Sequence, residues 1–361
     1  GGALTTVLIM AGGTGGHVYP ALTVASALRA RGVEVFWLGT RSGLEARVVP
    51  AQGMVIEWLD VKGLIGTTWR RKLAMPWMLI RAVFQALAVI RRRMPDVVLG
   101  MGGFAAGPGG IAARLTRRPL VIHEANAVSG LTNRLLAPLA RRVLAGFEDV
   151  SRLGPGTLWT GNPVRPDIVA VAMPAERGLA QAQQIRLLVL GGSQGAQIIN
   201  EALPSALQRA AHGAMLQVTH QSGAGRDDSV RKAYRQAGIQ ATVIAFIDDM
   251  AGAYSSADLV IARAGAMTVS ELCAVGLPAI LLPYPHAAGD HQSANAMFLA
   301  RAGCAVVISA ADLDSIHLAT EIDRLVQDRV LLRQMAERSR ALARPDATER
   351  VVKQCLELAD A

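Results

Sequence analysis

The chain has 361 residues, and at 51% hydrophobic but only 4% aromatic it holds enough aliphatic side chains for the cores of two domains. Three scattered cysteines, Cys273, Cys304 and Cys355, lack paired or metal-ligand spacing, which argues against a disulfide-built secreted protein and indicates a reducing compartment. The formal charge of +9 is uneven: residues 1–163 hold 19 Lys and Arg against 8 Asp and Glu, a net charge of +11, whereas residues 164–361 hold 18 against 20, a net charge of −2. The first half is therefore expected to bind an anionic partner, either nucleic acid or a membrane surface. Aromatic residues are few and no known nucleic-acid-binding module is recognisable, so the membrane is favoured.

A glycine-rich turn at residues 11–17 is the first motif. An apolar, β-prone run from Thr5 to Met10 precedes it, and Pro20 and a helical pattern from Ala21 to about Ala30 follow it. Strand, glycine turn and helix place bare backbone N–H groups at a helix N-terminus, which suits a phosphate. Any α/β domain also uses such turns, but His17 adds a titratable group at this place.

A basic and apolar segment follows the second predicted strand, residues 33–38. It holds a basic cluster at residues 69–72, an apolar run from Trp77 to Ile90 opened by Pro76 and interrupted by Arg81, and three closing arginines at residues 91–93. The run is too short to span a membrane. Two interpretations stay open: a core helix, or a helix on the bilayer surface that inserts apolar side chains and binds anionic headgroups through its arginines. The side chains that would insert are those of Trp69, Leu73, Trp77, Leu79 and Phe84.

Two further loops follow predicted strands in this half. A second glycine-rich loop, residues 100–110, comes after a strand at 96–99, and Glu124 and Asn126 come directly after a strand at 120–123. Ligands bind at the carboxyl ends of parallel strands, so these polar groups are candidate site residues. Turn formation and helix capping are the alternative roles of Glu124 and Asn126.

The pattern restarts after a junction at residues 160–166. A strand at 185–190, a glycine turn at 191–195 and a helix from Ile198 repeat the beginning of the chain, and the later predicted strands are 216–220, 242–246, 258–262 and 279–282. These βα repeats predict an α/β protein of two Rossmann-like, doubly wound parallel-sheet domains facing across a cleft. We expect domains at residues 1–163 and 164–343, and a helix at 344–361 that packs back on the first domain.

Several kinds of site are excluded by the motifs. The dinucleotide fingerprint fails because Gly13-x-Gly15 is followed at the third place by Val18, and the second strand ends at Thr40 without a carboxylate. No Gly-Lys-Ser/Thr loop is present. Asp312-Leu313-Asp314 has the spacing of a metal-binding pair, but that spacing is common and a helix cap is the expected role. We therefore expect no metal site and no required cofactor. A divalent ion could still stimulate the reaction by binding a diphosphate.

Taken together, six segments give the chain a close resemblance to the MurG family of GT-B glycosyltransferases over essentially its whole length. These segments, in the family's order, are residues 12–17 (GGTGGH), 123–127 (HEANA), 161–165 (GNPVR), 191–196 (GGSQGA), 246–250 (FIDDM) and 263–271 (RAGAMTVSE). The resemblance implies inverting transfer of N-acetylglucosamine from UDP-N-acetylglucosamine to the 4-hydroxyl of the muramyl sugar of lipid I (undecaprenyl-pyrophosphoryl-muramyl-pentapeptide), giving lipid II for peptidoglycan. It also implies a peripheral enzyme at the cytoplasmic face of the bacterial cell membrane, held by segment 69–93, with an acceptor-binding first domain, a UDP-sugar-binding second domain and no nucleic-acid partner.

The resemblance also assigns roles to residues. The backbone of Ile247 would bind uracil, and Glu271 would accept hydrogen bonds from the ribose hydroxyls. Thr268-x-x-Glu271 has the pattern of a helix capping box as well, and both roles are compatible. Gln292 would contact the sugar. The groups expected near the leaving diphosphate are Arg165, Ser193 and the start of a helix at Ala266, Met267, Thr268, Val269 and Ser270. The groups expected to face the sugar and the acceptor are Thr14, Gly15, Gly16 and Asn126.

His17 is the candidate general base. A helix N-terminus disfavours imidazolium, so His17 is expected to be neutral near pH 7 and able to take the proton of the acceptor hydroxyl. Hydrogen bonding to the acceptor or diphosphate without proton transfer is the alternative for His17, and Glu124 is the rival base.

The chain departs from the family's pattern at three places. Phe104 stands where a tyrosine is usual, Ala125 where a glutamine is usual, and Ser293 where some members have a second glutamine. The first two put polar contacts to the acceptor in question. Two other classes of function stay open: a UDP-N-acetylglucosamine 2-epimerase of the same fold, and a membrane-surface scaffold without catalysis, which would leave His17 unexplained.

Overall fold

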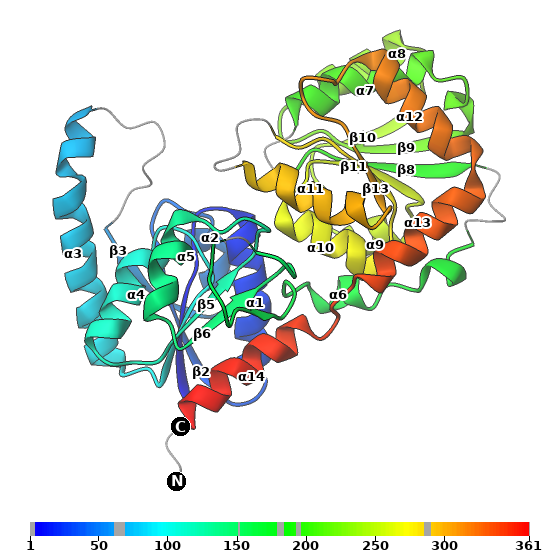
Figure 1. Ribbon diagram of the computed structural model, residues 1–361. Helices are drawn as coiled ribbons and strands as arrows, with labels where there is room; N and C mark the ends of the chain where they lie inside the picture. Colours follow the sequence, from blue (N-terminus) through cyan, green and yellow to red (C-terminus); the bar gives the residue numbers. More distant parts are fainter. Residues whose placement is uncertain are drawn as a thin grey trace. The chain divides into compact units, whose positions relative to one another are not determined.

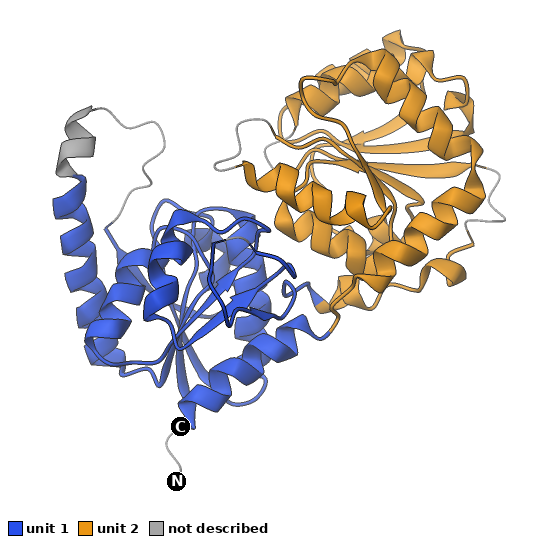
Figure 2. Ribbon diagram, in the orientation of Figure 1, with its two compact units in different colours: residues 1–165, 346–361 blue, residues 166–345 orange. Residues whose placement is uncertain are grey.

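The computed structural model describes residues 4–60, 69–150, 152–178, 184–192, 196–284 and 290–360, without the side chains of residues 69–74. The chain divides into two compact units (Figure 2): unit 1 is Gly1–Arg165 with Asp346–Ala361, and unit 2 is Pro166–Pro345. The sequence placed the divisions after residues 163 and 343, two residues before each observed one. The C-terminal helix belongs to unit 1.

Unit 1 is built on a parallel sheet of seven strands in the order β3-β2-β1-β4-β5-β6-β7 (Figure 1). Alternate residues of a strand face opposite sides, so a strand buried on both faces is apolar throughout. On β1, Val7 and Ile9 join one buried cluster, and Leu8 and Met10 join another on the opposite face. The strands are β1 Thr6–Met10, β2 Glu34–Thr40, β3 Val55–Leu59, β4 Val97–Gly100, β5 Leu120–Glu124, β6 Arg142–Ala145 and β7 Leu158–Trp159.

Helices cover both faces of this sheet. Val18 of α1, Val49 of α2 and Val351 of α14 join the cluster of Val7 and Ile9, whereas helices α3, α4 and α5 contribute to the cluster of Leu8 and Met10. The bounds are α1 Gly15–Arg29, α2 Glu45–Ala51, α3 Trp69–Arg93, α4 Ala106–Leu115, α5 Leu131–Leu136, the 3₁₀ turn η1 Ala137–Leu139 and α14 Ala347–Ala359.

Two helices begin earlier than the sequence predicted. Helix α1 starts at Gly15, not Ala21, and helix α3 starts at Trp69 and includes Pro76 instead of beginning there. Proline is favoured in the first turn and glycine is a poor helix former, so the pattern indicated a later start. Because α1 begins at Gly15, His17 lies in its first turn.

Unit 2 repeats the arrangement with six parallel strands in the order β10-β9-β8-β11-β12-β13, and its core includes Leu187 and Val189 of β8. The strands are β8 Ile185–Leu190, β9 Leu216–Gln221, β10 Ala241–Ile244, β11 Leu259–Ala262, β12 Ala279–Leu281 and β13 Ala305–Val307. The helices are α6 Pro166–Val169, α7 Gln197–Arg209, α8 Asp227–Gln236, α9 Met250–Ser255, α10 Ala266–Val275, α11 His291–Arg301, α12 Ser315–Gln327 and α13 Arg329–Ala341, with 3₁₀ turns η2 Pro174–Glu176 and η3 Gly213–Met215.

In the part of the chain that the structure describes, no helix has both the length and the apolar character needed to cross a bilayer. The three cysteines are buried and free.

Candidate active site

The two glycine-rich loops of unit 1 lie against each other. They follow β1 and β4, the neighbouring central strands at which the strand order reverses, where ligands bind in open parallel sheets. A Cβ added to Gly103 would lie 2.2 Å from the carbonyl oxygen of Gly12, and one added to Gly102 would lie 2.6 Å from Cδ2 of His17. The backbones therefore meet without side chains between them, and the imidazole of His17 lies beside the second loop.

The first turn of α1 presents its backbone at this place. Thr14 is the N-cap, and its carbonyl oxygen accepts the N–H of His17 at 3.1 Å and of Val18 at 3.2 Å. Gly15 and Gly16 are the first residues of the helix, so their N–H groups have no partner within it. Thr14 is exposed and His17 half-buried. The turn thus combines free donors, a helix N-terminus and an imidazole.

Glu124 organises the neighbouring loop after β5. Its buried carboxylate accepts four hydrogen bonds: from the N–H and side-chain amide of Asn126 at 3.0 and 3.2 Å, from the N–H of Gly130 at 3.0 Å and from Nδ2 of Asn133 at 2.8 Å. A carboxylate used in this way fixes Asn126 and the loop. The geometry accordingly favours His17 over Glu124 as the proton acceptor.

His123 anchors the same loop from the interior. Its Nε2 lies 3.0 Å from the carbonyl oxygen of Gly161, and Asn162 donates to the carbonyl of Ala125 at 2.9 Å. Burial lowers the pKa of His123, the Gly161 bond and Glu124 oppose that shift, and His17 adds to it. The loop is therefore tied to the segment that leads to Arg165, which is half-buried. Ala125 is itself buried.

Unit 2 has a second set of loops at its own reversal of strand order, between β8 and β11. Gly191 and Gly192 follow β8, and Ser193 lies outside the described residues. After β11, Gly265 is the N-cap of α10, and residues 266–270 form the start of that helix. Thr268 is inside the helix, not its cap, so the predicted capping box of Thr268 and Glu271 is wrong.

Two of the predicted nucleotide-binding residues of unit 2 are Glu271 and Ile247. The hydroxyl of Tyr254, a buried side chain of α9, donates to Oε2 of Glu271 at 2.8 Å. The side chain of Ile247 is buried, and within the described ranges its backbone N–H and C=O make no hydrogen bond. The backbone N–H and C=O of Ile247 are thus available to a ligand, and the bond from Tyr254 orients the carboxylate of Glu271.

Gln292, Tyr284 and Arg263 form a third group in unit 2. Oε1 of Gln292, in the first turn of α11, accepts the N–H of Tyr284 at 2.9 Å, and the guanidinium of Arg263 lies 4.7 Å from the centre of the Tyr284 ring. Burial lowers the pKa of Arg263, with Tyr284 opposing. Arg263 and Tyr284 were not predicted as site residues, although Arg263 opens the segment 263–271; their signal is their position after the carboxyl ends of β11 and β12.

The family resemblance assigns the ribose hydroxyls of the donor nucleotide to Glu271. On that assignment we expect Tyr254→Phe to raise the KM for the donor about three- to tenfold, because it removes one hydrogen bond that orients Glu271. Turnover at saturating donor should change little. Steady-state kinetics with varied donor concentration will test this, with Tyr19→Phe, an exposed tyrosine of unit 1, as the control. An unchanged KM would show that Glu271 does not depend on Tyr254.

His220 gives unit 2 a pH-dependent stability. Its ring is fully buried between the hydroxyl of Tyr234 at 2.8 Å and Oδ1 of Asn200 at 2.9 Å, and burial lowers its pKa from 6.5 to about 4. Below pH 6.5 the unfolded chain takes up the proton and the folded unit does not, so stability should fall as the pH drops from about 6.5 to 4, by about 3 kcal/mol. Urea unfolding at pH 7.5 and 5 should show about 2 kcal/mol of this loss, and His220→Gln should show a smaller difference.

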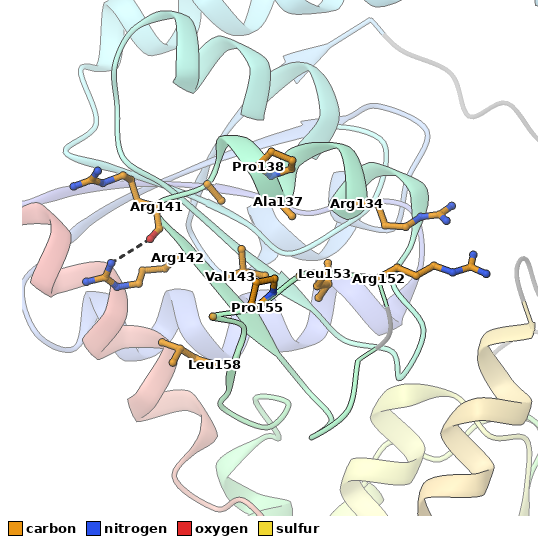
Figure 3. Close-up of a pocket in the computed structure, with 13 residues that line it drawn as sticks. Arg134, Ala137, Pro138, Arg141, Arg142, Val143, Arg152, Leu153, Pro155 and Leu158 are labelled. Carbon is orange, nitrogen blue, oxygen red and sulfur yellow. Dashed lines mark hydrogen bonds between the residues drawn. The ribbon is translucent and has the colours of Figure 1, made fainter.

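A separate pocket of about 640 Å³ in unit 1 is lined by four arginines (Figure 3). It lies at the amino ends of β6 and β7, the opposite edge of the sheet from His17. Figure 3 shows Arg134 and Arg152 extending to one side of it and Arg141 and Arg142 to the other. The guanidinium groups do not converge on one ligand position.

Possible metal ligands do not gather in the part of the chain that the structure describes: no group of three or more His, Cys, Asp or Glu is placed to hold an ion. Asp314 caps α12, accepting the N–H groups of Ile316 and His317 at 2.8 and 2.7 Å, as the sequence predicted.

Comparisons with known proteins agree on one family. Residues 7–145 match the glycosyltransferase family 28 N-terminal domain and residues 186–351 its C-terminal domain. The UDP-N-acetylglucosamine–N-acetylmuramyl-(pentapeptide) pyrophosphoryl-undecaprenol N-acetylglucosamine transferase of Alkalilimnicola ehrlichii is 54% identical over 97% of this chain and 98% of its own, and that of Halorhodospira halophila is 52% identical over 99% of each. The crystal structure of Acinetobacter baumannii MurG superposes with a TM-score of 0.84 at 37% identity, covering 98% of this chain and 99% of its own. The UDP-GlcNAc 2-epimerase of Neisseria meningitidis, at 15% identity over 98% of this chain and 100% of its own, shares the fold alone, with a TM-score of 0.68.

Proposed function

Because this chain belongs to glycosyltransferase family 28 and to its MurG enzymes, we propose that it transfers N-acetylglucosamine from UDP-N-acetylglucosamine to the 4-hydroxyl of the muramyl sugar of lipid I. The observation that carries this proposal is 54% identity to a curated transferase over 97% of the chain. The product, lipid II, serves peptidoglycan biosynthesis and through it cell shape and division. The likeness to the epimerase is one of fold, at 15% identity.

The acceptor reaction belongs to unit 1 in this proposal. Nε2 of His17 takes the proton of the 4-hydroxyl, the oxygen forms a bond to C1 of the donor sugar, and the bond from C1 to the diphosphate oxygen breaks with inversion. Glycine N–H groups at the start of α1 bind the acceptor. Asn126, fixed by Glu124, faces the sugar together with Thr14, Gly15 and Gly16.

The donor is assigned to unit 2, and the family resemblance adds Arg165 as a group that binds the diphosphate. The backbone of Ile247 binds uracil, Glu271 accepts from the ribose hydroxyls and Gln292 contacts the sugar. Residues 266–270, Arg165 and Ser193 neutralise the charge of the leaving diphosphate, because a helix N-terminus and a guanidinium both stabilise anions. The proposed reaction requires no metal ion. The one role left to a divalent ion is to help neutralise the charge of the diphosphate.

Helix α3 is proposed as the membrane contact at the cytoplasmic face. Trp77, Ile80 and Phe84 are 75%, 47% and 67% exposed, and their spacing puts them on one side of the helix. Figure 1 shows this helix, in light blue, at the margin of unit 1 beside α4. Arg81 pairs with Asp60 at 3.1 Å. Arg92 and Arg93 pair with Glu57, which leaves Arg91 of the closing arginines for anionic headgroups.

Among the predicted apolar contacts whose side chains the structure describes, Leu79 is exposed by 38%, less than Trp77 and Phe84, and Ile80, which was not predicted, is exposed as well. The side chains of Trp69 and Leu73 lie outside the described residues.

The double variant Trp77→Ser, Phe84→Ser should bind vesicles of anionic phospholipid at least about tenfold more weakly, because two exposed apolar side chains are lost. Vesicle co-sedimentation will measure this, and transfer to a water-soluble short-chain acceptor should be unchanged. The matched control is Ile316→Ser, Val330→Ser, two exposed apolar residues of unit 2. Equal binding by both variants would remove α3 as the contact.

The activity itself is tested by incubating the protein with UDP-[¹⁴C]N-acetylglucosamine and a short-chain lipid I analogue, with and without chelator. Labelled disaccharide-lipid is the expected product, formed in both conditions. Formation of UDP-N-acetylmannosamine without an acceptor would establish the epimerase instead, and transfer abolished by chelator would establish a metal requirement.

A further inference from the structure

Glu45 is a fully buried carboxylate that the proposed mechanism does not use. It is the first residue of α2, and each of its oxygens is a hydrogen-bond acceptor. Oε2 accepts the N–H of Gly13 at 2.9 Å, and Oε1 accepts the N–H and the hydroxyl of Thr40 at 3.0 and 2.8 Å. Glu45 therefore joins the glycine turn after β1 to the end of β2.

Three glycines pack closely against the side chain of Glu45. A Cβ on Gly12 would lie 2.6 Å from Oε1, one on Gly43 would lie 2.0 Å from Oε2, and one on Gly39 would lie 2.8 Å from Cγ. Real Cβ atoms do not approach so closely, so each position has room only for a hydrogen. Gly12 in the turn after β1, Gly39 in β2 and Gly43 just after β2 therefore share one constraint, the side chain of Glu45.

The contacts fix both sides of Gly13. Its N–H donates to Glu45, its carbonyl oxygen accepts the N–H of Leu44 at 3.4 Å, and its φ of +89° is a backbone conformation that favours glycine. Gly12 is held on its other side by the backbone of Gly103. The peptide planes just before the α1 N-terminus therefore have one orientation, which determines where the N–H groups of Gly15 and Gly16 point and where His17 stands.

We propose that Glu45 is a positioning residue for the transferase: it holds the glycine turn in the conformation that binds the acceptor and places His17. This inference rests on the proposed function of that turn. An amide in place of the carboxylate would turn an NH₂ toward the N–H of Gly13 or of Thr40, so one of the three bonds would become a donor–donor contact. Charge-assisted bonds of this kind correspond to about 10- to 100-fold in an equilibrium constant.

The test compares Glu45→Gln with Asp96→Asn. Asp96 also accepts a backbone N–H in unit 1, that of Thr6 at 2.8 Å, but at the amino end of the sheet. For Glu45→Gln we expect kcat/KM for the lipid I analogue to fall about 10- to 100-fold, with an unchanged KM for UDP-N-acetylglucosamine. Glu45→Asp, which keeps the charge but not the reach, should be impaired as well. Asp96→Asn should lower the melting temperature without a selective loss on the acceptor side.

Amide hydrogen exchange keeps this test independent of activity. Glu45→Gln should speed exchange in peptides covering residues 11–18 and leave the peptides of unit 2 unchanged. If wild-type protein transfers no sugar, the proposed function fails, and the exchange data still decide whether Glu45 holds the turn. Equal acceptor kinetics in Glu45→Gln and Asp96→Asn, or unchanged exchange at residues 11–18, would overturn the inference.

Discussion

Turnover of the His17→Ala variant is expected to be about 100- to 10,000-fold below that of the wild type, the range for loss of a general base. His17 lies in the first turn of α1 against Gly102, whereas the rival Glu124 is occupied by four hydrogen bonds within its own loop. The KM for UDP-N-acetylglucosamine should change less than about threefold, because the residues that we propose to bind the nucleotide belong to unit 2. Steady-state transfer to a short-chain lipid I analogue measures both quantities.

The control is His317→Ala, a half-buried histidine of unit 2 whose Nδ1 lies 3.1 Å from the carbonyl oxygen of Asp312. It should leave both kinetic constants as they are. Turnover of His17→Ala within a few-fold of the wild type would remove His17 from proton transfer, and a similar loss in Glu124→Gln with a normal melting temperature would favour Glu124 as the base.

Gly103→Ala should lower the free energy of unfolding of unit 1 by about 2–5 kcal/mol and abolish most transfer. The new Cβ would lie 2.2 Å from the carbonyl oxygen of Gly12, a backbone atom that moves only if the whole turn moves, and the residue has a φ of +84°. Left-handed strain accounts for about 1–2 kcal/mol and overpacking for about 1–3 kcal/mol. Chemical denaturation followed by circular dichroism will give the loss of stability.

Gly53→Ala separates the two contributions. Gly53 has a φ of +66°, but nothing lies within 4 Å of its Cβ position, so only the strain of about 1–2 kcal/mol is expected. If Gly103→Ala is no less stable than Gly53→Ala, the two glycine loops do not press together as described.

The central strands could be predicted from the sequence because burial on both faces leaves a nearly continuous apolar run. Residues 185–190 are an example, and the observed β8 has the same bounds. The outer strand β7 has only two residues, too few for such a pattern, whereas β13 was not predicted although it is apolar throughout. The starts of α1 and α3 were missed because Pro20 and Pro76 indicated helix beginnings, while packing of the apolar faces kept both helices continuous through them.

For the site, the residues alone predicted the glycine turns and His17, and the family resemblance supplied the role of each donor residue. The bonds of Glu45 to Gly13 and of Tyr254 to Glu271 join segments 32 and 17 residues apart, and no periodic pattern reports such contacts. The predicted capping box was wrong for a local reason: the N-cap of α10 is Gly265, three residues before Thr268.

The C-terminal helix has a consequence for how the chain is made. Val351, Val352, Cys355 and Leu358 of α14 complete the same buried cluster as Val7 and Val24 near the other end of the chain. On the ribosome, the whole of unit 2 is therefore synthesised before unit 1 can complete its core. Unit 2, which is one continuous segment, can fold while an apolar face of residues 1–165 is still exposed. Contacts across more than 300 residues of sequence are expected to form late in folding, because closing so long a loop costs conformational entropy. A chain stopped before residue 347 would leave that face open to chaperones and proteases.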